Sequence, residues 1–333
     1  MDKEVKVLFI SPEFYQYTNA IIDELNKKNI KTTFYPWWPH LSLFKKYFFK
    51  KKEKNRRKTM DKYLSKILEE TKGQDFSLIL LNSTIYFSKE QIKRLLDAFP
   101  NAKKAFFMWD TIINYPVCES YIDLFDKFYS FDKTDCEKYN LIYRPDYCDP
   151  SLLNKQKSDL AKDIDLFFIG SVDPFRYTVI KNAEKYCKDN GLTYKFVMFF
   201  RSKLIYKLNK MVHKEFRKSK TSEFIFAPIS PKEKDELFAR SKVMLEIPRE
   251  RQNGMSMRSI ESQMLSMKMA TTQDAIKLYD LYDENNVVVI SKDDFSSLTK
   301  EFINGEYKNL DKAILDQYTP ESFVKTVILD NLK

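Results

Sequence analysis

The chain has 333 residues, of which 43% are hydrophobic and 15% aromatic, which is enough apolar material for two α/β domains and excludes a largely disordered chain. Its net charge of +10 indicates an anionic partner, which is a nucleic acid, an acidic lipid surface or a phosphorylated substrate. Only two histidines are present, and no two of the four cysteines have CxxC spacing, so a histidine-rich or CxxC metal site is excluded.

The amino-terminal sequence MDKEVKVLFIS is too short and too charged for a signal peptide. Its apolar part, residues 5–10, is instead expected to form the first buried strand. No apolar run in the chain approaches the roughly 18 residues that a membrane span needs. We therefore expect a cytoplasmic protein.

The first half of the chain alternates apolar runs with helical patterns, which favours a parallel sheet covered by helices on both faces. The predicted strands are residues 5–10, 30–34, 76–81, 105–109 and, more weakly, 128–131. The predicted helices are residues 19–29, 60–72 and 89–99.

A basic segment, residues 43–58, interrupts this pattern with the sequence LFKKYFFKKKEKNRRK. Aromatic side chains alternate with lysines in it, a composition suited to an anionic membrane surface. We expect this segment to contact the inner leaflet of a membrane.

Two carboxylates follow predicted strands of the first half. Asp110 comes directly after the strand 105–109, and Glu13 lies in the loop after the first strand. A carboxylate at a strand end can act as a base toward a hydroxyl group. For Asp110, capping of a turn is an equally consistent alternative.

The second half starts the strand–helix alternation again after a polar stretch, residues 149–162. Its predicted strands are 164–169, 194–199, 243–247, 269–272 and 287–290, and its predicted helices are 176–190, 203–218, 231–241, 257–267 and 295–304. A last helix, 320–332, is expected to begin at Thr319-Pro320. The predicted domains are therefore residues 1–150 and 151–318, followed by the terminal helix, 319–333.

A second basic stretch, residues 201–220, has apolar residues at helical spacing. We interpret it as an amphipathic helix that packs its apolar side on the sheet and leaves its basic side in solvent.

Two of the five glycines lie between a strand and a helix of the second half, where open α/β sheets bind ligands. Gly170 and Ser171 follow an apolar strand, and Arg176 falls in the first turn of the next helix. This arrangement suits a phosphate group. The alternative is an ordinary turn in which Asp173 caps the helix and Pro174 opens it.

Gly254 lies in the second such loop, which continues into a helix that Ser256 is expected to cap. The residues in this region that we expect to contact a nucleotide diphosphate are Arg249, Gly254, Ser256, Arg258, Ser259 and Glu261. Arg258 would neutralise the pyrophosphate, and Glu261 would accept hydrogen bonds from ribose hydroxyls. The alternative is a surface Arg–Glu pair of little energetic value.

The stretch 245–272, LEIPRERQNGMSMRSIESQMLSMKMATT, resembles the donor site of GT-B glycosyltransferases. The similarity is closest to the CgeB-like group and to bacterial capsule and lipopolysaccharide transferases, with their S-x-R-x-x-E pattern at Ser256, Arg258 and Glu261. The segment FFIGSVDPFR, ending at Arg176, is similar to the first strand and turn of the same domain.

This resemblance implies an α/β GT-B fold with two facing Rossmann-like domains, a cleft between them and a carboxyl-terminal helix that crosses back to the first domain. It also implies transfer of a sugar from a nucleotide diphosphate-sugar, UDP-sugar being the expected donor, to a saccharide or lipid-linked saccharide. An inverting enzyme of this kind uses a base such as Asp110 or Glu13. No metal cofactor is expected.

Two alternatives remain open on the sequence alone: a basic nucleic-acid-binding α/β protein and a non-catalytic scaffold at the membrane. No zinc spacing or RNA-binding motif supports the first, and we expect no nucleic-acid partner. The pair Asp163 and Asp165 has the spacing of a DxD metal motif, but it precedes its strand, so we reject a metal site there.

Overall fold

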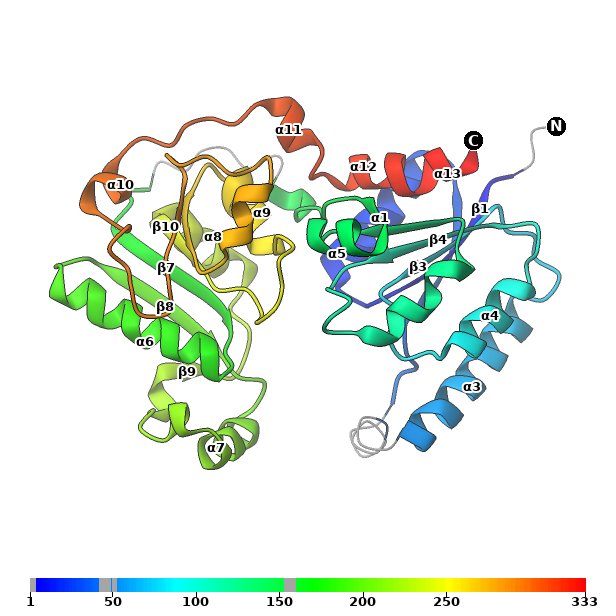
Figure 1. The fold of residues 1–333 in the computed structure, drawn as a ribbon, viewed down its shortest axis with the longest axis horizontal. Helices are drawn as coiled ribbons and strands as arrows, with labels where there is room; N and C mark the ends of the chain where they lie inside the picture. The colour runs from blue at the N-terminus through cyan, green and yellow to red at the C-terminus, as the bar shows by residue number, and fades with distance from the viewer. Residues whose placement is uncertain (1–3, 42–48, 50–52, 153–159) are drawn as a thin grey trace. The chain divides into compact units, whose positions relative to one another are not determined.

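The computed structural model describes residues 4–41, 49, 53–152 and 160–333. The chain forms two compact units (Figure 1). Unit 1 consists of Met1–Pro150, Arg251–Met255 and Lys312–Lys333, and unit 2 of Ser151–Glu250 and Ser256–Asp311. Each unit contains a six-stranded parallel sheet with helices against it, as the alternation of apolar runs predicted.

The sheet of unit 1 has the strand order β2-β1-β3-β4-β5-β6. Its strands are β1 (Lys6–Ser11), β2 (Lys31–Pro36), β3 (Leu78–Asn82), β4 (Lys103–Met108), β5 (Lys127–Ser130) and β6 (Ile142–Tyr143). Its helices are α1 (Tyr15–Lys27), α3 (Glu53–Glu70), α4 (Lys89–Asp97), the 3-10 helix Pro116–Leu124, α5 (Lys133–Tyr139), α11 (Lys312–Asp316), α12 (Pro320–Phe323) and α13 (Asp330–Leu332).

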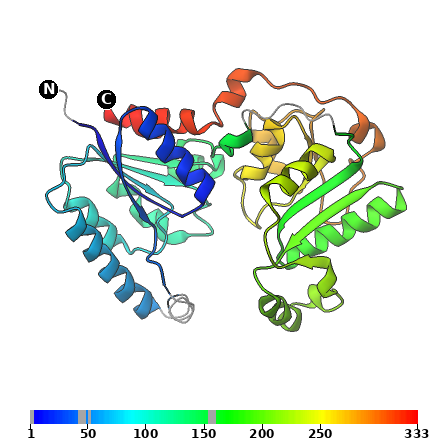
Figure 2. The ribbon, with the colours of Figure 1, turned by 180° about the vertical axis from the view of Figure 1, so that it is seen from behind.

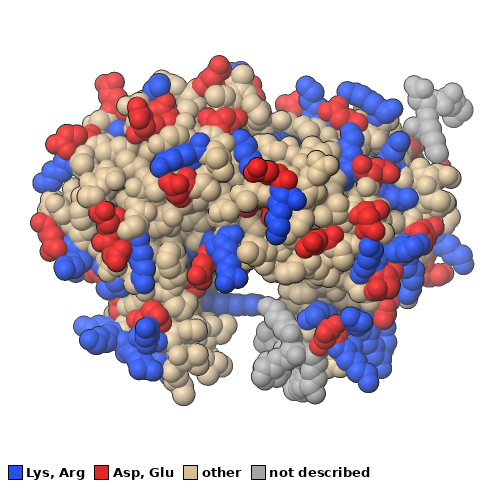
Figure 3. Space-filling view, in the orientation of Figure 1, with Lys and Arg blue, Asp and Glu red and all other residues tan. Residues whose placement is uncertain are grey.

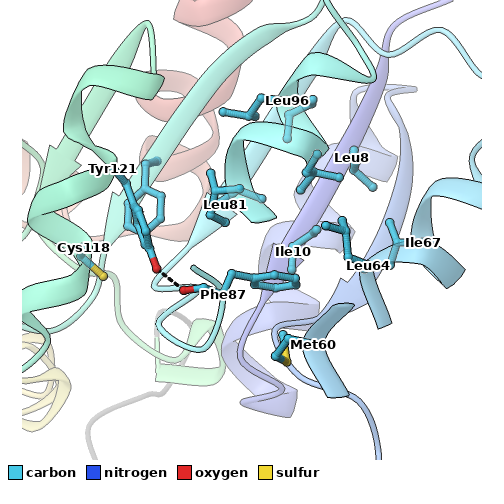
Figure 4. Close-up of a cluster of buried hydrophobic side chains, with 14 of the residues drawn as sticks. Leu8, Ile10, Met60, Leu64, Ile67, Leu81, Phe87, Leu96, Cys118 and Tyr121 are labelled. Carbon is cyan, nitrogen blue, oxygen red and sulfur yellow. Dashed lines mark hydrogen bonds between the residues drawn. The ribbon is translucent and has the colours of Figure 1, made fainter. Parts of the chain in front are cut away.

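Side chains of the central strands alternate between two apolar cores, one on each face of this sheet. Leu8 and Ile10 point into the core that α3 and α4 cover, and Figure 4 shows this cluster with Leu64 of α3 and Leu96 of α4. Val7 and Phe9 point to the opposite face, which α1 and the carboxyl-terminal helices cover. The sheet is therefore buried on both faces, which explains its continuous apolar strands.

The carboxyl-terminal segment belongs to unit 1, although it is last in the chain. The side chain of Thr319 accepts a hydrogen bond from the backbone N–H of Ser322, and Pro320 occupies the first turn, so the predicted start of this helix is confirmed. The helix continues through a π-helical stretch, Val324–Leu329, into α13. Phe323 packs edge-on against Phe107 of β4, and Figure 2 shows α12 beside α1 on the same face of the sheet.

The sheet of unit 2 has the strand order β12-β11-β10-β7-β8-β9. Its strands are β7 (Ile164–Ser171), β8 (Tyr194–Phe199), β9 (Phe224–Ile225), β10 (Ser241–Glu246), β11 (Lys268–Thr271) and β12 (Val287–Val289). Its helices are α6 (Pro174–Asp189), α7 (Lys203–Val212), α8 (Pro231–Arg240), α9 (Met257–Met264) and α10 (Lys300–Asn304). In chain order within the unit, this is the Rossmann arrangement 3-2-1-4-5-6 read from its other edge.

Three helices of unit 2 are shorter than the sequence predicts, among them the helix expected over 257–267, which ends at Met264. The helix expected over 295–304 is reduced to α10, which begins at Lys300. The side chains of Ser291 and Asp294 form turns before it, and Thr299 caps its start. The helix expected over 203–218 ends at Val212, and the 3-10 turn Lys214–Phe216 follows it.

Candidate functional site

The two central strands of unit 2, β7 and β10, meet where the strand order of the sheet reverses. Open α/β sheets bind ligands at this point, outside the carboxyl ends of the strands. Gly170 and Ser171 are the last residues of β7, and Glu246 is the last residue of β10. The helices that follow these strands begin nearby, α6 at Pro174 and α9 at Met257, so both direct backbone N–H groups toward this edge.

Glu246 is the centre of a polar network at this edge. Its carboxylate is fully buried and accepts hydrogen bonds from Nε of Arg258 at 2.8 Å and from Nη2 at 3.3 Å. The hydroxyl of Ser256 donates a further bond to the same carboxylate at 2.8 Å. Ser256 also caps α9 as predicted, accepting from the N–H of Ser259. The network therefore fixes both the start of α9 and the guanidinium of Arg258.

Burial of the Glu246 carboxylate raises its pKa. The charges of Arg258 and Arg176 and the hydrogen bonds from Arg258 and Ser256 lower the pKa by more than burial raises it, so it lies below the ordinary glutamate value. Glu246 is therefore ionised at neutral pH. Its negative charge is what allows Arg258 to occupy the first turn of α9, where the helix dipole disfavours a cation.

Arg176 links the ends of the two strands. Its Nε donates to the carbonyl of Ile247 at 2.8 Å and its Nη1 to the carbonyl of Ser171 at 3.2 Å. Burial lowers the pKa of this guanidinium, and the charge of Arg258 lowers it further. The helix that carries Arg176 is capped by Asp173, with Pro174 in its first turn, so the ordinary-turn interpretation of this loop is also correct.

Gly170 has a steric reason to lack a side chain. A Cβ atom there would lie 3.2 Å from Nη1 of Arg258 and 3.3 Å from the ring of Phe168. The glycine therefore leaves room for the guanidinium at the end of β7. Arg249, three residues after the end of β10, is exposed and contributes to the electrostatic environment of Arg176.

Glu261 is buried, and one of its carboxylate oxygens lies 3.5 Å from Nζ of Lys234 in α8. Ser259 is also buried at the start of α9. The carboxylate that Arg258 binds is Glu246, so the description of Arg258 and Glu261 as a surface pair is wrong. The structure brings together Gly170, Ser171, Arg176, Ser256, Arg258 and Ser259 around Glu246.

Gly254 belongs to unit 1, whereas the other predicted donor residues belong to unit 2. A Cβ atom at Gly254 would lie 2.3 Å from the ring of Phe131. The backbone N–H of Gly254 donates to Oδ2 of Asp132 at 2.9 Å. Close packing against Phe131 thus accounts for this glycine without a ligand.

We expect Gly254→Ala to lower the free energy of unfolding of unit 1 by about 1–3 kcal/mol, because the added methyl group overpacks against Phe131. Chemical denaturation followed by circular dichroism measures this difference. Phe131→Leu in the Gly254→Ala background should recover part of the loss. Equal stability of Gly254→Ala and the parent chain would contradict the packing explanation.

The two candidate bases lie at the carboxyl edge of the sheet in unit 1. The rings of Phe14 and Trp109 stack at a centroid distance of 5.1 Å, and each is the sequence neighbour of one candidate, Glu13 or Asp110. The two loops are therefore in contact. Oδ1 of Asp110 accepts hydrogen bonds from the N–H of Thr111 and from Nδ2 of Asn114, so this carboxylate does form the predicted turn cap. Oε1 of Glu13 lies 3.5 Å from Nε2 of His40.

Several buried polar oxygens follow the central strands of unit 1. Oδ1 of Asn82, Oγ1 of Thr84 and Oγ1 of Thr111 have no hydrogen-bond partner among the described residues. Asp135 is close by and accepts from the N–H of Ile112, and burial raises its pKa to about 6. The oxygens of Asn82, Thr84 and Thr111 are buried polar groups for which the described residues supply no hydrogen-bond partner.

No family model and no curated protein sequence matches the chain. Solved structures do match it over nearly its whole length. The Anabaena protein HepE, crystallised with UDP and glucose, superposes with a TM-score of 0.60 at 10% identity, over 98% of this chain and 97% of HepE. Sucrose-phosphate synthase from Thermosynechococcus elongatus gives 0.63 at 10% identity over 98% and 97%. The UDP-forming α,α-trehalose-phosphate synthase from Burkholderia xenovorans gives 0.62 at 9% identity over 98% and 100%.

The chain has the GT-B fold. In this GT-B chain, as predicted, each half is an α/β unit built on a parallel sheet. The comparison structures share about a tenth of their residues with it, so the likeness establishes the fold, and the activity has to be argued from the site.

Most of the basic segment 43–58 lies outside the described residues. Phe49, one of its aromatic residues, is buried against Trp38 and Tyr86. This ring therefore does not take part in the expected membrane contact of the segment, because it completes the core under α3. Residues 53–58 form the first turns of α3. Among the described helices, none combines the length and apolar character of a membrane span.

Asp163 and Asp165 lie at the amino end of β7, away from the carboxyl edge. Asp163 accepts two hydrogen bonds from Arg240, and Asp165 accepts one from Lys242. Both carboxylates are thus occupied by ion pairs.

Glu246 is the residue of the candidate site that sequence reasoning missed. The signal was present, because a single carboxylate interrupts the otherwise apolar strand sequence VMLEI. A charge at such a position is buried only when it is paired. Lys234, the partner of Glu261, carries no comparable signal in its exposed-looking helix sequence PKEKDELF.

Proposed function

We propose that this GT-B chain is a glycosyltransferase that transfers a sugar from a nucleotide diphosphate-sugar, with UDP-sugar the expected donor, to a saccharide acceptor. One observation carries the proposal: the charges of Arg258 and Arg176 act on the buried carboxylate of Glu246 where the strand order of unit 2 reverses, and the charge of Arg249 acts on Arg176. Concentrated positive charge beside two helix N-termini suits a diphosphate.

The comparison structures support this assignment. HepE was also crystallised with UDP-glucose, and the trehalose-phosphate synthase is described as UDP-forming. From the S-x-R-x-x-E pattern we further propose that the chain is a relative of the CgeB-like and capsule or lipopolysaccharide transferases. In this proposal Arg258 and Arg249 bind the diphosphate, while Arg176 holds the strand ends that shape the site. Glu261, whose carboxylate lies 3.5 Å from Nζ of Lys234, accepts hydrogen bonds from the ribose.

The acceptor is assigned to unit 1. Asp110 or Glu13 would take the proton of the attacking hydroxyl while the sugar–phosphate bond breaks, and the released nucleotide diphosphate would stay with the arginines. We propose a lipid-linked saccharide as acceptor and a role in bacterial surface polysaccharide synthesis. The enzyme would be cytoplasmic, with residues 43–58 near the inner leaflet. The guanidiniums would replace a metal ion at the diphosphate.

We expect Arg258→Ala to weaken UDP binding by about 10- to 100-fold, because it removes a charge-assisted hydrogen-bond donor from the diphosphate. Uridine, which lacks the diphosphate, should bind the parent and the variant equally. Isothermal titration calorimetry measures both affinities. Arg240→Ala is the matched control, since Arg240 pairs with Asp163 at the other end of the sheet. Equal UDP affinity of Arg258→Ala and the parent would remove Arg258 from the site.

The proposed function is tested by a screen of nucleotide diphosphates and their sugars. We expect UDP or a UDP-sugar to raise the melting temperature and to retain its affinity in excess EDTA. Slow release of UDP from one UDP-sugar should identify the donor sugar. Stabilisation by no nucleotide diphosphate would refute the proposal, and binding abolished by EDTA would refute its metal-independent form.

A further inference from the structure

Helix α7 of unit 2 has its apolar side in solvent, the reverse of the arrangement that its sequence pattern predicts. Only Tyr206 of this helix is buried. Five large apolar side chains are exposed on it, with exposed fractions between 37% and 77%: Leu204, Ile205, Leu208, Met211 and Val212. The prediction that this side packs on the sheet is therefore wrong.

The inward side of α7 is held by polar and aromatic contacts. The ring of Tyr206 packs against Phe200 and Phe224, and its hydroxyl lies 2.9 Å from the hydroxyl of Ser219. Lys210, one turn later, donates to the carbonyl of Ser219 at 2.6 Å. These contacts occupy the side of the helix opposite the apolar residues. The orientation of α7 is thus fixed by named bonds, and the apolar side faces outward as a consequence.

The outward residues form one continuous stripe. At 100° per residue, they cover an arc of about 120° on the helix, centred opposite Tyr206. Of the large apolar side chains that are exposed in the described part of the chain, five of eleven lie on this ten-residue helix. Single exposed apolar residues are ordinary on protein surfaces, but a clustered stripe marks an interaction site.

The surroundings of the stripe are strongly basic. Residues 201–220 contain eight Lys or Arg and a single carboxylate, Glu215. Lys203 and Lys207 are exposed along one border of the stripe. Figure 1 shows α7 at one end of unit 2, and Figure 3 shows basic side chains beside uncharged surface there.

We propose that α7 is an interfacial helix that inserts Leu204, Leu208 and Met211 into the surface of an anionic bilayer while its lysines contact the lipid phosphates. An apolar stripe flanked by basic residues is typical of helices that lie in the plane of a membrane surface. The net positive charge of residues 201–220 complements the phosphates of anionic lipids. This membrane contact is separate from the donor site, so an experiment can refute it while the proposed function stands.

Sedimentation of the full chain with vesicles tests the proposal. We expect it to bind vesicles of phosphatidylcholine with phosphatidylglycerol more tightly than vesicles of phosphatidylcholine alone. Leu208→Ser combined with Met211→Ser should weaken binding to the anionic vesicles by at least about tenfold. Lys203→Gln combined with Lys207→Gln should reduce the preference for phosphatidylglycerol.

The matched control is Ile113→Ser combined with Leu278→Ser, which removes exposed apolar side chains elsewhere and should bind vesicles as the parent does. An unchanged melting temperature and UDP affinity would show that each variant is folded. The proposal is overturned if the α7 variant sediments like the parent, or if the parent binds neither vesicle. It is also overturned if the parent is a dimer that the α7 variant converts to a monomer, because the stripe would then bind a second copy.

Discussion

Replacing Glu246 with alanine is expected to lower the free energy of unfolding by about 3 kcal/mol and to weaken UDP binding. The substitution leaves Arg176 buried beside Arg258 without the carboxylate between them. Breaking a buried ion pair by removing one partner costs about 3–5 kcal/mol. The lower end applies because the Arg258 side chain keeps 25% of its surface in solvent.

Urea denaturation and calorimetry measure the two effects of Glu246→Ala. Because the pKa of Glu246 is lowered by folding, its contribution is present above the ordinary glutamate value of 4.5 and is lost as pH falls through the lowered pKa. The stability difference between parent and variant should therefore shrink in acid. Glu246→Gln is the shape-matched control, and it should retain some stability while still misplacing Arg258. A fully stable variant with unchanged UDP affinity would show that Glu246 does not organise the site.

Replacing Asp110 with asparagine is expected to lower kcat by about 10²–10⁴-fold if this carboxylate is the base for the acceptor hydroxyl. The amide keeps the acceptor oxygen that caps the turn through Thr111 and Asn114, so the fold should be retained. UDP affinity should not change, since the donor residues lie in unit 2. Product formation from the sugar nucleotide found in the screen, at saturating donor, measures kcat.

The comparison with Glu13→Gln decides between the two carboxylates. Their loops touch through the stacked rings of Phe14 and Trp109, so both have access to the same edge of the sheet. The variant with the larger loss of kcat identifies the base. Full activity of both variants would exclude both residues and favour a mechanism without a protein base.

The sequence alone was sufficient to predict the α/β architecture, because a strand that is buried on both faces has to be an apolar run. β1 and β7 are such runs, and each was predicted to within two residues. Predicted capping by Ser256 and Thr319 was also correct, because caps depend on neighbours within one turn. Apolar runs and helix caps depend on residues that are close together in the sequence, so one sequence is enough to predict them.

The predictions from sequence were wrong where residues far apart in the chain determine how a helix or a loop packs. The spacing of Leu204, Leu208 and Met211 shows that α7 is amphipathic, but only Tyr206 and its aromatic neighbours determine which side faces inward. The packing of Gly254 depends on Phe131, which belongs to a distant part of the sequence. Periodicity and motif spacing carry no information about such pairs.

The assignment of the last helix to unit 1 also has a consequence for biosynthesis. The apolar face of Val7 and Phe9 is covered partly by Val327 and Ile328, near the end of the chain. On the ribosome this face stays incompletely covered until all of unit 2 has been translated. The nascent protein therefore exposes this apolar surface while unit 2 is synthesised, and a chain that lacks residues 320–332 would be prone to aggregate.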